Sequence, residues 1–180
     1  MSPLDKIAII PQLVLGAISY EDYTSFSYYN YLDSIGREIM ERVDSSQNVT
    51  YSPRENLPSC KSGNNQFIYG YVSGPKYFNS RDFVICTYNI WNYFGEREFV
   101  YQVNATVRHE ATHSAQFCKG GNRLLGIDQR KFSGYPYESV YGPYSGYKQE
   151  PHQVKLMELE AFALESEPYF VLRSLERFCF

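Results

Sequence analysis

Histidine, tryptophan and cysteine are scarce in this sequence, whose 180 residues contain three, one and four of them. The cysteines form no Cys-x-x-Cys pair and no zinc-finger spacing with histidine, which excludes a cysteine-rich zinc site. Their even number permits two disulfides, but we expect reduced, buried thiols, because the sequence carries no convincing secretory signal. The four residues are Cys60, Cys86, Cys118 and Cys179.

Long apolar runs and an excess of positive charge are also absent. No stretch reaches the roughly 18 to 20 apolar residues that span a bilayer, so we expect no contact with a membrane interior. Pro11 interrupts the apolar run at 7–19 and Asp5 cancels the charge of Lys6, which favours a cytoplasmic protein over a secreted one. The net charge of −3 provides no basic footprint, so we expect no nucleic-acid partner.

Tyrosine is the abundant residue type, with 18 of the 180 residues. Hydrophobic residues make up 43% and charged residues 21% of the chain, which is typical of a globular domain of this length. A buried tyrosine must find a partner for its hydroxyl, so this many tyrosines indicates rings that line a groove or lie at the surface.

The order of the expected elements predicts one α+β domain over residues 1–180, without internal repeats. Helical spacing of apolar residues predicts the first helix, Gly120 and Gly121 mark the end of the second, and Pro168 separates the last two. β-Branched and aromatic runs predict two strands of a small sheet. The helices are expected at 20–43, 100–117 and 152–167, with a closing helix from Pro168 to Arg177, and the strands at 66–72 and 82–88. The chain then divides into an N-terminal helix and loops (1–65), a sheet (66–98), a helix that carries the site (99–121), a tyrosine-rich loop (122–151) and C-terminal helices (152–180).

The sequence His109-Glu110-Ala111-Thr112-His113 carries the clearest chemical signal and uses two of the three histidines. On a helix, residues four apart lie one turn apart on the same face, so both imidazoles can reach one metal ion. The glutamate beside the first histidine is placed to take a proton from a water held there. Gly120 and Gly121 follow the segment and favour the end of a helix, which is the context this motif requires.

A catalytic zinc ion needs a third protein ligand. The third histidine, His152, lies far along the chain, and no further histidine follows the motif at the spacing of a metzincin. The acidic segment 157–165 offers carboxylates instead, on a predicted helix whose alanines permit close packing. Glu158 and Glu160 point about 200° apart on a helix, so only one of them can be the ligand.

These two segments together resemble the gluzincin branch of the zincin metallopeptidases, over about 25 residues. A Glu-x-x-Ala pattern on a later helix supplies the third ligand in several such families, and Glu158-Leu159-Glu160-Ala161 fits it, as does the register that begins at Glu160. The resemblance implies a zincin-like fold, in which a small sheet packs on the active-site helix and on a C-terminal glutamate helix. The motif segment is also similar to short zincin-like proteins of cyanobacteria and their phages.

The resemblance further implies one zinc ion per chain, with His109, His113 and Glu158 as its ligands and Glu110 as the catalytic base. Glu158 is favoured over Glu160 because Glu165, seven residues on, shares its face and can accept a hydrogen bond from a ligand histidine. Many relatives carry Asp or Asn four residues after the ligand, where this chain has Phe162.

Zincins also supply a tyrosine or histidine to the developing oxyanion, and they hold a peptide against the edge of a sheet. The expected strand at 82–88, just before the motif helix, is in the place of such an edge. The tyrosine-rich loop is the expected source of the oxyanion donor and of a cleft wall for apolar side chains. The candidate donors are Tyr137, Tyr141, Tyr144, Tyr147 and His152.

The sequence therefore predicts a hydrolase, a zinc metallopeptidase that acts on a peptide or protein substrate. The alternative is a catalytically silent zincin-like module that binds or assembles through a tyrosine-rich surface. A metal-dependent hydrolase of another amide or ester is a third reading. Glu110 favours catalysis, because a degenerate zincin commonly loses the base before the ligands.

Overall fold

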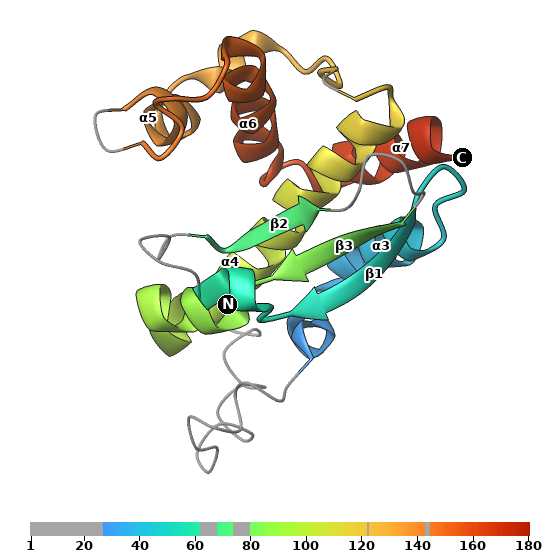
Figure 1. The fold of residues 1–180 in the computed structure, drawn as a ribbon, viewed down its shortest axis with the longest axis vertical. Helices are drawn as coiled ribbons and strands as arrows, with labels where there is room; N and C mark the ends of the chain where they lie inside the picture. The colour runs from blue at the N-terminus through green and yellow to red at the C-terminus, as the bar shows by residue number, and fades with distance from the viewer. Residues whose placement is uncertain (1–26, 62–67, 74–79, 122, 143–144) are drawn as a thin grey trace, which may run out of the picture.

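The computed structural model describes residues 27–61, 68–73, 80–121, 123–142 and 145–180 (Figure 1). Within these ranges the chain forms an α+β fold, in which short helices and strands precede one long helix, and one 3-10 helix and three α-helices follow it (Figure 1); 3-10 helices are labelled η. The elements are η2 (Tyr28–Tyr31), α3 (Ser34–Asp44), β1 (Thr50–Glu55), η3 (Pro58–Lys61), β2 (Gly70–Ser73), β3 (Ser80–Ile85), α4 (Thr87–Cys118), η4 (Gln129–Phe132), α5 (Tyr135–Tyr141), α6 (His152–Leu164) and α7 (Pro168–Cys179).

The three strands form one mixed sheet in the order β1-β3-β2. β3 pairs with β1 in parallel, with Tyr51 opposite Arg81, and with β2 in antiparallel, with Val72 opposite Phe83. β3 is therefore the central strand. The expectation that this strand presents a free edge beside the motif helix is wrong, because β1, expected as a loop, pairs on one side and β2 on the other. The edge beside α4 belongs to β2.

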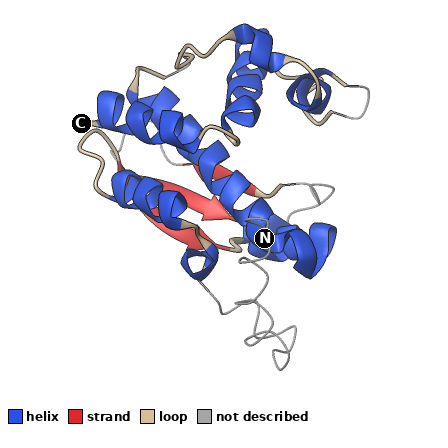
Figure 2. Cartoon of the chain, turned by 180° about the vertical axis from the view of Figure 1, so that it is seen from behind, coloured by secondary structure: helices blue, strands red, loops and turns tan. Residues whose placement is uncertain are grey.

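α4 is the longest helical element of the described residues. It lies behind the sheet in Figure 1 and therefore in front of it in Figure 2, which shows the molecule from behind. It begins at Thr87 rather than at residue 100, and Gly95, with φ of 68°, separates a short first part from the part that carries the motif. A positive φ is costly for residues with a Cβ, so glycine is the residue that permits this bend. Gly120 and Gly121 have positive φ and follow the end of the helix, as the sequence predicts.

The main hydrophobic core lies between the sheet and the helices α3, α4 and α7. Phe83 and Ile85 of β3 and Val107 and Ala111 of α4 are among its fully buried members. A second, smaller cluster joins η4, α5 and α6 through Phe132, Val140, Leu159 and Ala163. In Figure 1, α5 and α6 stand above the sheet and α4 passes behind the sheet.

The N-terminal and tyrosine-rich segments differ from the expected elements. The helix expected at 20–43 consists of η2 and α3, and its first seven residues lie outside the described ranges, as does the apolar run at 7–19. The tyrosine-rich segment contains α5, which begins with a proline in its first turn. The expected helices at 152–167 and from Pro168 correspond to α6 and α7.

All four cysteines are paired, in the disulfides Cys60–Cys86 and Cys118–Cys179. The expectation of reduced thiols is therefore wrong. The two partners of each pair are 26 and 61 residues apart in sequence, and only the fold brings them together. In the part of the chain that the structure describes, no helix combines the length and apolarity needed to cross a membrane.

Candidate metal centre

The two motif histidines lie on one face of α4, one turn apart, and point at the same space. The Nε2 atoms of His109 and His113 are 3.2 Å apart. Only 7% of His109 is exposed, and His113 is partly buried, so both rings lie at the floor of a recess rather than on the open surface. The motif helix therefore arranges the imidazoles as the spacing of the histidines predicts.

Glu158 approaches both imidazoles from α6, the helix that packs across α4. Its Oε2 is 3.2 Å from Nε2 of His109, and its Oε1 is 3.4 Å from Nε2 of His113. One ligand atom from each residue lies within 4.8 Å of the others, and no other such group occurs among the described residues. Two imidazole nitrogens and one carboxylate oxygen are a ligand set that suits zinc and leaves a fourth position open.

His109 is held by a second glutamate through its other ring nitrogen. Nδ1 of His109 is 3.0 Å from Oε1 of Glu165, and Glu165 lies one residue beyond the end of α6. This contact leaves Nε2 free to face Glu158, as in metal sites where a carboxylate orients a ligand histidine. Phe162, at the position where many gluzincins carry Asp or Asn, packs its ring against His109 at a centroid distance of 4.5 Å.

His113 is oriented by Gln116, a residue that the sequence analysis does not single out. Nδ1 of His113 is 2.9 Å from Oε1 of Gln116. The Nε2 of Gln116 donates to Oε2 of Glu160 at 2.9 Å and to the carbonyl of Met157 at 3.2 Å. The amide oxygen of Gln116 therefore faces the histidine, and the histidine presents Nε2 to the site. Sequence could have indicated Gln116 by its position, because a residue three positions after His113 on a helix lies on the same face.

Glu160, the alternative third ligand, is fully buried away from the site. Its carboxylate accepts hydrogen bonds from the backbone N–H groups of Leu125 at 2.6 Å and Gly126 at 2.7 Å, and one from the side-chain amide of Gln116. This carboxylate fixes the segment that follows α4 and reaches the site only through Gln116. Of the two registers that the sequence permits, the structure brings Glu158 to the histidines.

Glu158 and the two histidines stabilise each other's charged forms, although the charge of His109 opposes that of His113 and lowers its pKa. Burial lowers the pKa of His109, but hydrogen bonds to Glu158 and Glu165 outweigh burial and raise this pKa well above its ordinary value. Burial opposes the charged form of Glu158 as well, but the charge of His113 and the hydrogen bond to His109 bring its pKa below the usual range. A divalent cation would replace the imidazole protons in this arrangement, so its binding would release protons.

Glu110 lies beside the cluster, between the motif helix and the edge strand β2. Only 5% of it is exposed, and burial raises its pKa above the ordinary value, although the charges of His109 and His113 oppose this rise. A Cβ atom at Gly70 would lie 2.9 Å from Cγ of Glu110, so β2 approaches the motif helix as closely as glycine permits. A buried carboxylate of raised pKa at such a position suits a general base.

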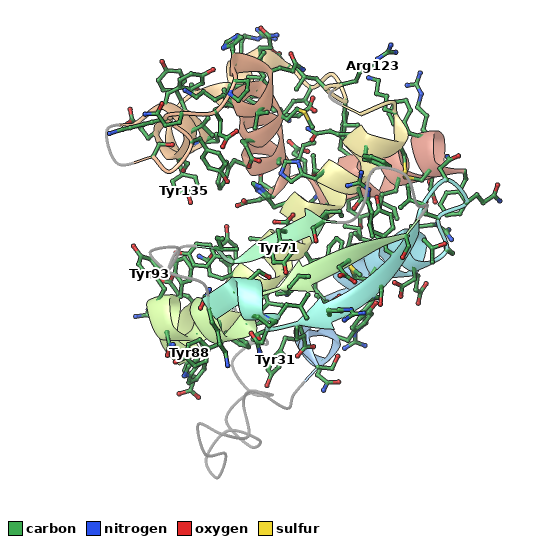
Figure 3. The ribbon with its side chains drawn as sticks, in the orientation of Figure 1. Tyr31, Tyr71, Tyr88, Tyr93, Arg123 and Tyr135 are labelled. Atoms are coloured by element: carbon green, nitrogen blue, oxygen red, sulfur yellow. A yellow bond between two sulfur atoms is a disulfide. The ribbon has the colours of Figure 1, made fainter. Side chains whose placement is uncertain are left out.

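A cleft of about 1200 Å³ opens over these residues. One wall is the edge strand β2 with Tyr69 and Tyr71, and the other comes from α5, α6 and the segment between them, with Tyr135 and Tyr147. Figure 3 shows Tyr71 and Tyr135 on opposite sides of the opening. His109, Glu110, His113 and Glu158 line the same cleft.

Among the candidate oxyanion donors, the cleft contains Tyr147. Burial, and then the charge of Glu158 and a hydrogen bond to it, raise the pKa of the Tyr147 hydroxyl, so the hydroxyl keeps its proton and can donate. Tyr141 and His152 are 3.0 Å apart at Oη and Nδ1, and Tyr137 stacks on Tyr141; none of the three lines the cleft. Tyr144 lies outside the described residues.

Comparison with known proteins gives one match. No curated protein and no solved structure matches the chain. A family described as a domain of unknown function, DUF8637, matches residues 28–180. The matched range contains every described element, including the motif helix and the glutamate helix α6. Since the match covers far more than half of its length, the chain belongs to the DUF8637 family.

Proposed function

We propose that this protein is a zinc metallopeptidase of the gluzincin type. The observation that carries the proposal is the convergence of His109, His113 and Glu158, with each histidine held through Nδ1 so that Nε2 faces the shared space. A chance cluster of polar residues would not require both imidazoles to be oriented by separate partners. A zincin-like fold is part of the proposal, and the packing of α6 on the motif helix and the position of β2 along it support this fold.

The chemistry follows from the ligand set and from Glu110. A zinc ion in this set would act as a Lewis acid toward a peptide carbonyl and would make a nearby water more acidic. The carboxylate of Glu110 would take the proton that the attacking water gives up and pass it to the departing amine nitrogen. The Tyr147 hydroxyl, protonated in the cleft, would donate a hydrogen bond to the oxygen that gains negative charge.

The substrate in this proposal is an extended peptide that lies along β2. An edge strand offers unpaired backbone groups, and a peptide can pair with them as an added strand. β2 is an edge strand, and Gly70, Tyr71 and Val72 line the cleft. The rings of Tyr69, Tyr135 and Phe162 also line it and favour apolar or aromatic side chains.

The metal is tested first. Elemental mass spectrometry of protein purified without chelator should give about one zinc per chain for wild type and none for Glu158→Ala. Glu98→Ala is the matched control, because Glu98 is an exposed glutamate of α4 outside the cleft. Wild-type protein that takes up no zinc, even after zinc is added back, would refute the proposal.

Catalysis is tested second, with a mixture of randomised peptides read by mass spectrometry. Zinc-loaded wild type should cleave peptides, whereas Glu110→Gln should bind zinc and lose at least about a hundredfold in rate, because general-base catalysis contributes that much. Equal cleavage by both proteins would show that Glu110 is not the base and that a contaminant or another group acts.

A binding or assembly module is the second candidate, supported by the exposed tyrosines. Among the described residues, five tyrosines are at least half exposed: Tyr93, Tyr101, Tyr135, Tyr137 and Tyr169. Exposed aromatic rings of this kind are enriched at protein interfaces. This reading predicts zinc-independent binding to a partner and no cleavage by wild type, so the same two experiments separate it from the peptidase.

A further inference from the structure

Among the described residues that line the cleft, Arg81 is a cation without a carboxylate at ion-pair distance. Arg81 belongs to the same face of β3 as Phe83 and Ile85, both fully buried against the helices. A charged side chain on such a face normally pairs with an opposite charge, because burying an unpaired charge is costly. In the described part of the chain, no carboxylate lies within ion-pair distance of Arg81; the neighbouring Asp82 pairs with Arg54 instead.

Arg81 is held flat against an aromatic ring. Its guanidinium carbon is 3.4 Å from the centroid of the Phe117 ring, a stacked cation–π contact. Stacking uses the face of the guanidinium and leaves the N–H groups at its edge available. Arg81 and Phe117 both line the cleft, and no other Lys or Arg is among the described lining residues.

The residue opposite Arg81 in the sheet does not neutralise it. Tyr51 of β1 pairs with Arg81 in register. Burial raises the pKa of the Tyr51 hydroxyl, so the phenol stays neutral. Partial burial lowers the pKa of Arg81, but a guanidinium keeps its charge at any ordinary pH. The cleft thus contains a fixed positive charge with which no described carboxylate forms an ion pair.

The position of Arg81 relative to the metal centre follows from the motif helix. Phe117 is four residues after His113, so it lies one helical turn, about 6 Å, further along α4. An extended peptide advances about 3.3 Å per residue. A carboxylate at Arg81 therefore belongs to a residue about two positions from the carbonyl at the metal centre.

We propose that Arg81, supported by Phe117, forms a subsite that binds a carboxylate of the peptide substrate about two residues from the bond to be cut. The carboxylate is an Asp or Glu side chain or the C-terminus of the peptide. A planar guanidinium with free N–H groups matches a carboxylate and can bind both oxygens. This inference rests on the proposed peptidase function, since it places the peptide along β2 and over the histidines.

The test measures binding, so it does not depend on turnover. Pools of labelled hexapeptides carry Glu or Gln at one fixed position, with the other positions randomised and the C-terminus free or amidated. Binding to Glu110→Gln, zinc-loaded and metal-free, is followed by fluorescence anisotropy. When the fixed position is the one that reaches Arg81, the Glu pool should bind about tenfold more tightly than the Gln pool. This ratio is the effect of one charge-assisted pair. A tenfold preference for the free over the amidated C-terminus would identify the terminal carboxylate as the ligand.

Arg81→Gln in the Glu110→Gln background should reduce that preference to less than about twofold, because the ion pair can no longer form. Arg97→Gln is the control, because Arg97 is exposed on α4 outside the cleft and its loss changes the net charge equally. A protein with Arg81 that shows no carboxylate preference overturns the inference, even if Arg81→Gln does not fold. A preference that survives in folded Arg81→Gln overturns it as well.

The two proposals fail in different ways. If zinc-loaded wild type cleaves none of these pools but the carboxylate preference depends on Arg81, the peptidase proposal fails, and Arg81 stands as a carboxylate-binding residue without the assigned distance to a cleaved bond. If wild type cleaves the Glu and Gln pools equally and Arg81→Gln cleaves like wild type, the subsite fails and the peptidase stands.

Discussion

At the scale of single residues, two glutamates of α6 that are two positions apart have opposite surroundings. Glu158 faces the histidines at the edge of the cleft, whereas Glu160 is fully buried and accepts hydrogen bonds from Leu125, Gly126 and Gln116. The local sequence permits either glutamate to be the third metal ligand. The angle of about 200° between the two side chains makes the choice exclusive, and the packing of α6 on α4 determines which one reaches the site.

This difference predicts different outcomes for two alanine substitutions in metal-free protein. Glu160→Ala leaves buried N–H groups without acceptors, so it should lower the free energy of unfolding by about 3 kcal/mol. Glu158→Ala should abolish zinc uptake with a smaller loss of stability, because its carboxylate borders the cleft. Urea unfolding in the presence of a chelator measures both. A Glu160→Ala protein as stable as wild type would contradict the role of this carboxylate.

The contact between Glu165 and His109 predicts an effect on zinc affinity without loss of a ligand. Glu165→Ala removes the acceptor at Nδ1 of His109, and loss of such a partner typically weakens metal binding about 10- to 100-fold. Glu165→Gln keeps an oxygen that can accept the same hydrogen bond, so it should weaken binding less. Competition with a chromophoric chelator gives the affinities. Equal affinities for wild type and Glu165→Ala would show that the contact does not orient the ligand.

At the scale of elements, sequence patterns predicted the helices better than the sheet. The end of the motif helix follows from the glycines after it, and the division between the two C-terminal helices follows from Pro168. β1 was missed because its sequence, Thr-Tyr-Ser-Pro-Arg-Glu, contains turn formers and has no alternation of apolar residues. Its stability comes from parallel pairing with β3, about 30 residues later, which no local pattern reveals.

The candidate site was predictable to a similar extent. Local spacing identified the histidines and Glu110, and the face shared by Glu158 and Glu165 on one helix suggested a ligand and its neighbour. Gln116 was missed, because its contact with Glu160 joins α4 to α6 across 44 residues. Arg81 was missed for the same reason: its stacking partner Phe117 is 36 residues away, on α4, and comes near only when β3 packs on that helix.

The close approach of β2 to α4 predicts that Gly70 cannot be replaced without disturbing the base. A Cβ at Gly70 would lie 2.7 Å from Thr106 Cγ2 and 2.9 Å from Glu110 Cγ. Gly70→Ala should therefore lower stability by about 1–3 kcal/mol and reduce peptide cleavage, because Glu110 must move. Gly146→Ala is the control, since Gly146 also lines the cleft but has no atom within 4 Å of its Cβ position. Equal thermal stability and cleavage by both variants would contradict this packing.

At the scale of the whole molecule, one disulfide lies at the sheet and the other joins two helices. Cys60–Cys86 joins the segment before β2 to the residue after β3, on the sheet face away from the main core. Cys118–Cys179 joins the end of the motif helix to the end of α7. The expectation of reduced thiols followed from the absence of a convincing secretory signal. The observed pairing contradicts it and leaves the expectation of a cytoplasmic protein without support from the cysteines, because disulfides persist mainly in oxidising compartments.

Reduction should therefore destabilise the molecule as a whole without dismantling the ligand cluster at once. The longer loop closed by Cys118–Cys179 restricts the unfolded chain more. Cys118→Ser with Cys179→Ser should therefore lower the free energy of unfolding more than the Cys60–Cys86 double variant, each by about 2–4 kcal/mol.

Mass spectrometry of non-reduced digests checks the pairing, and urea unfolding with and without reductant measures the loss of stability. His113 lies five residues before Cys118 at the end of α4, so the loss of this disulfide should also weaken zinc binding, whereas loss of Cys60–Cys86 should not. Four thiols that react with an alkylating agent in native, unreduced protein would contradict both the pairing and this order of stabilities.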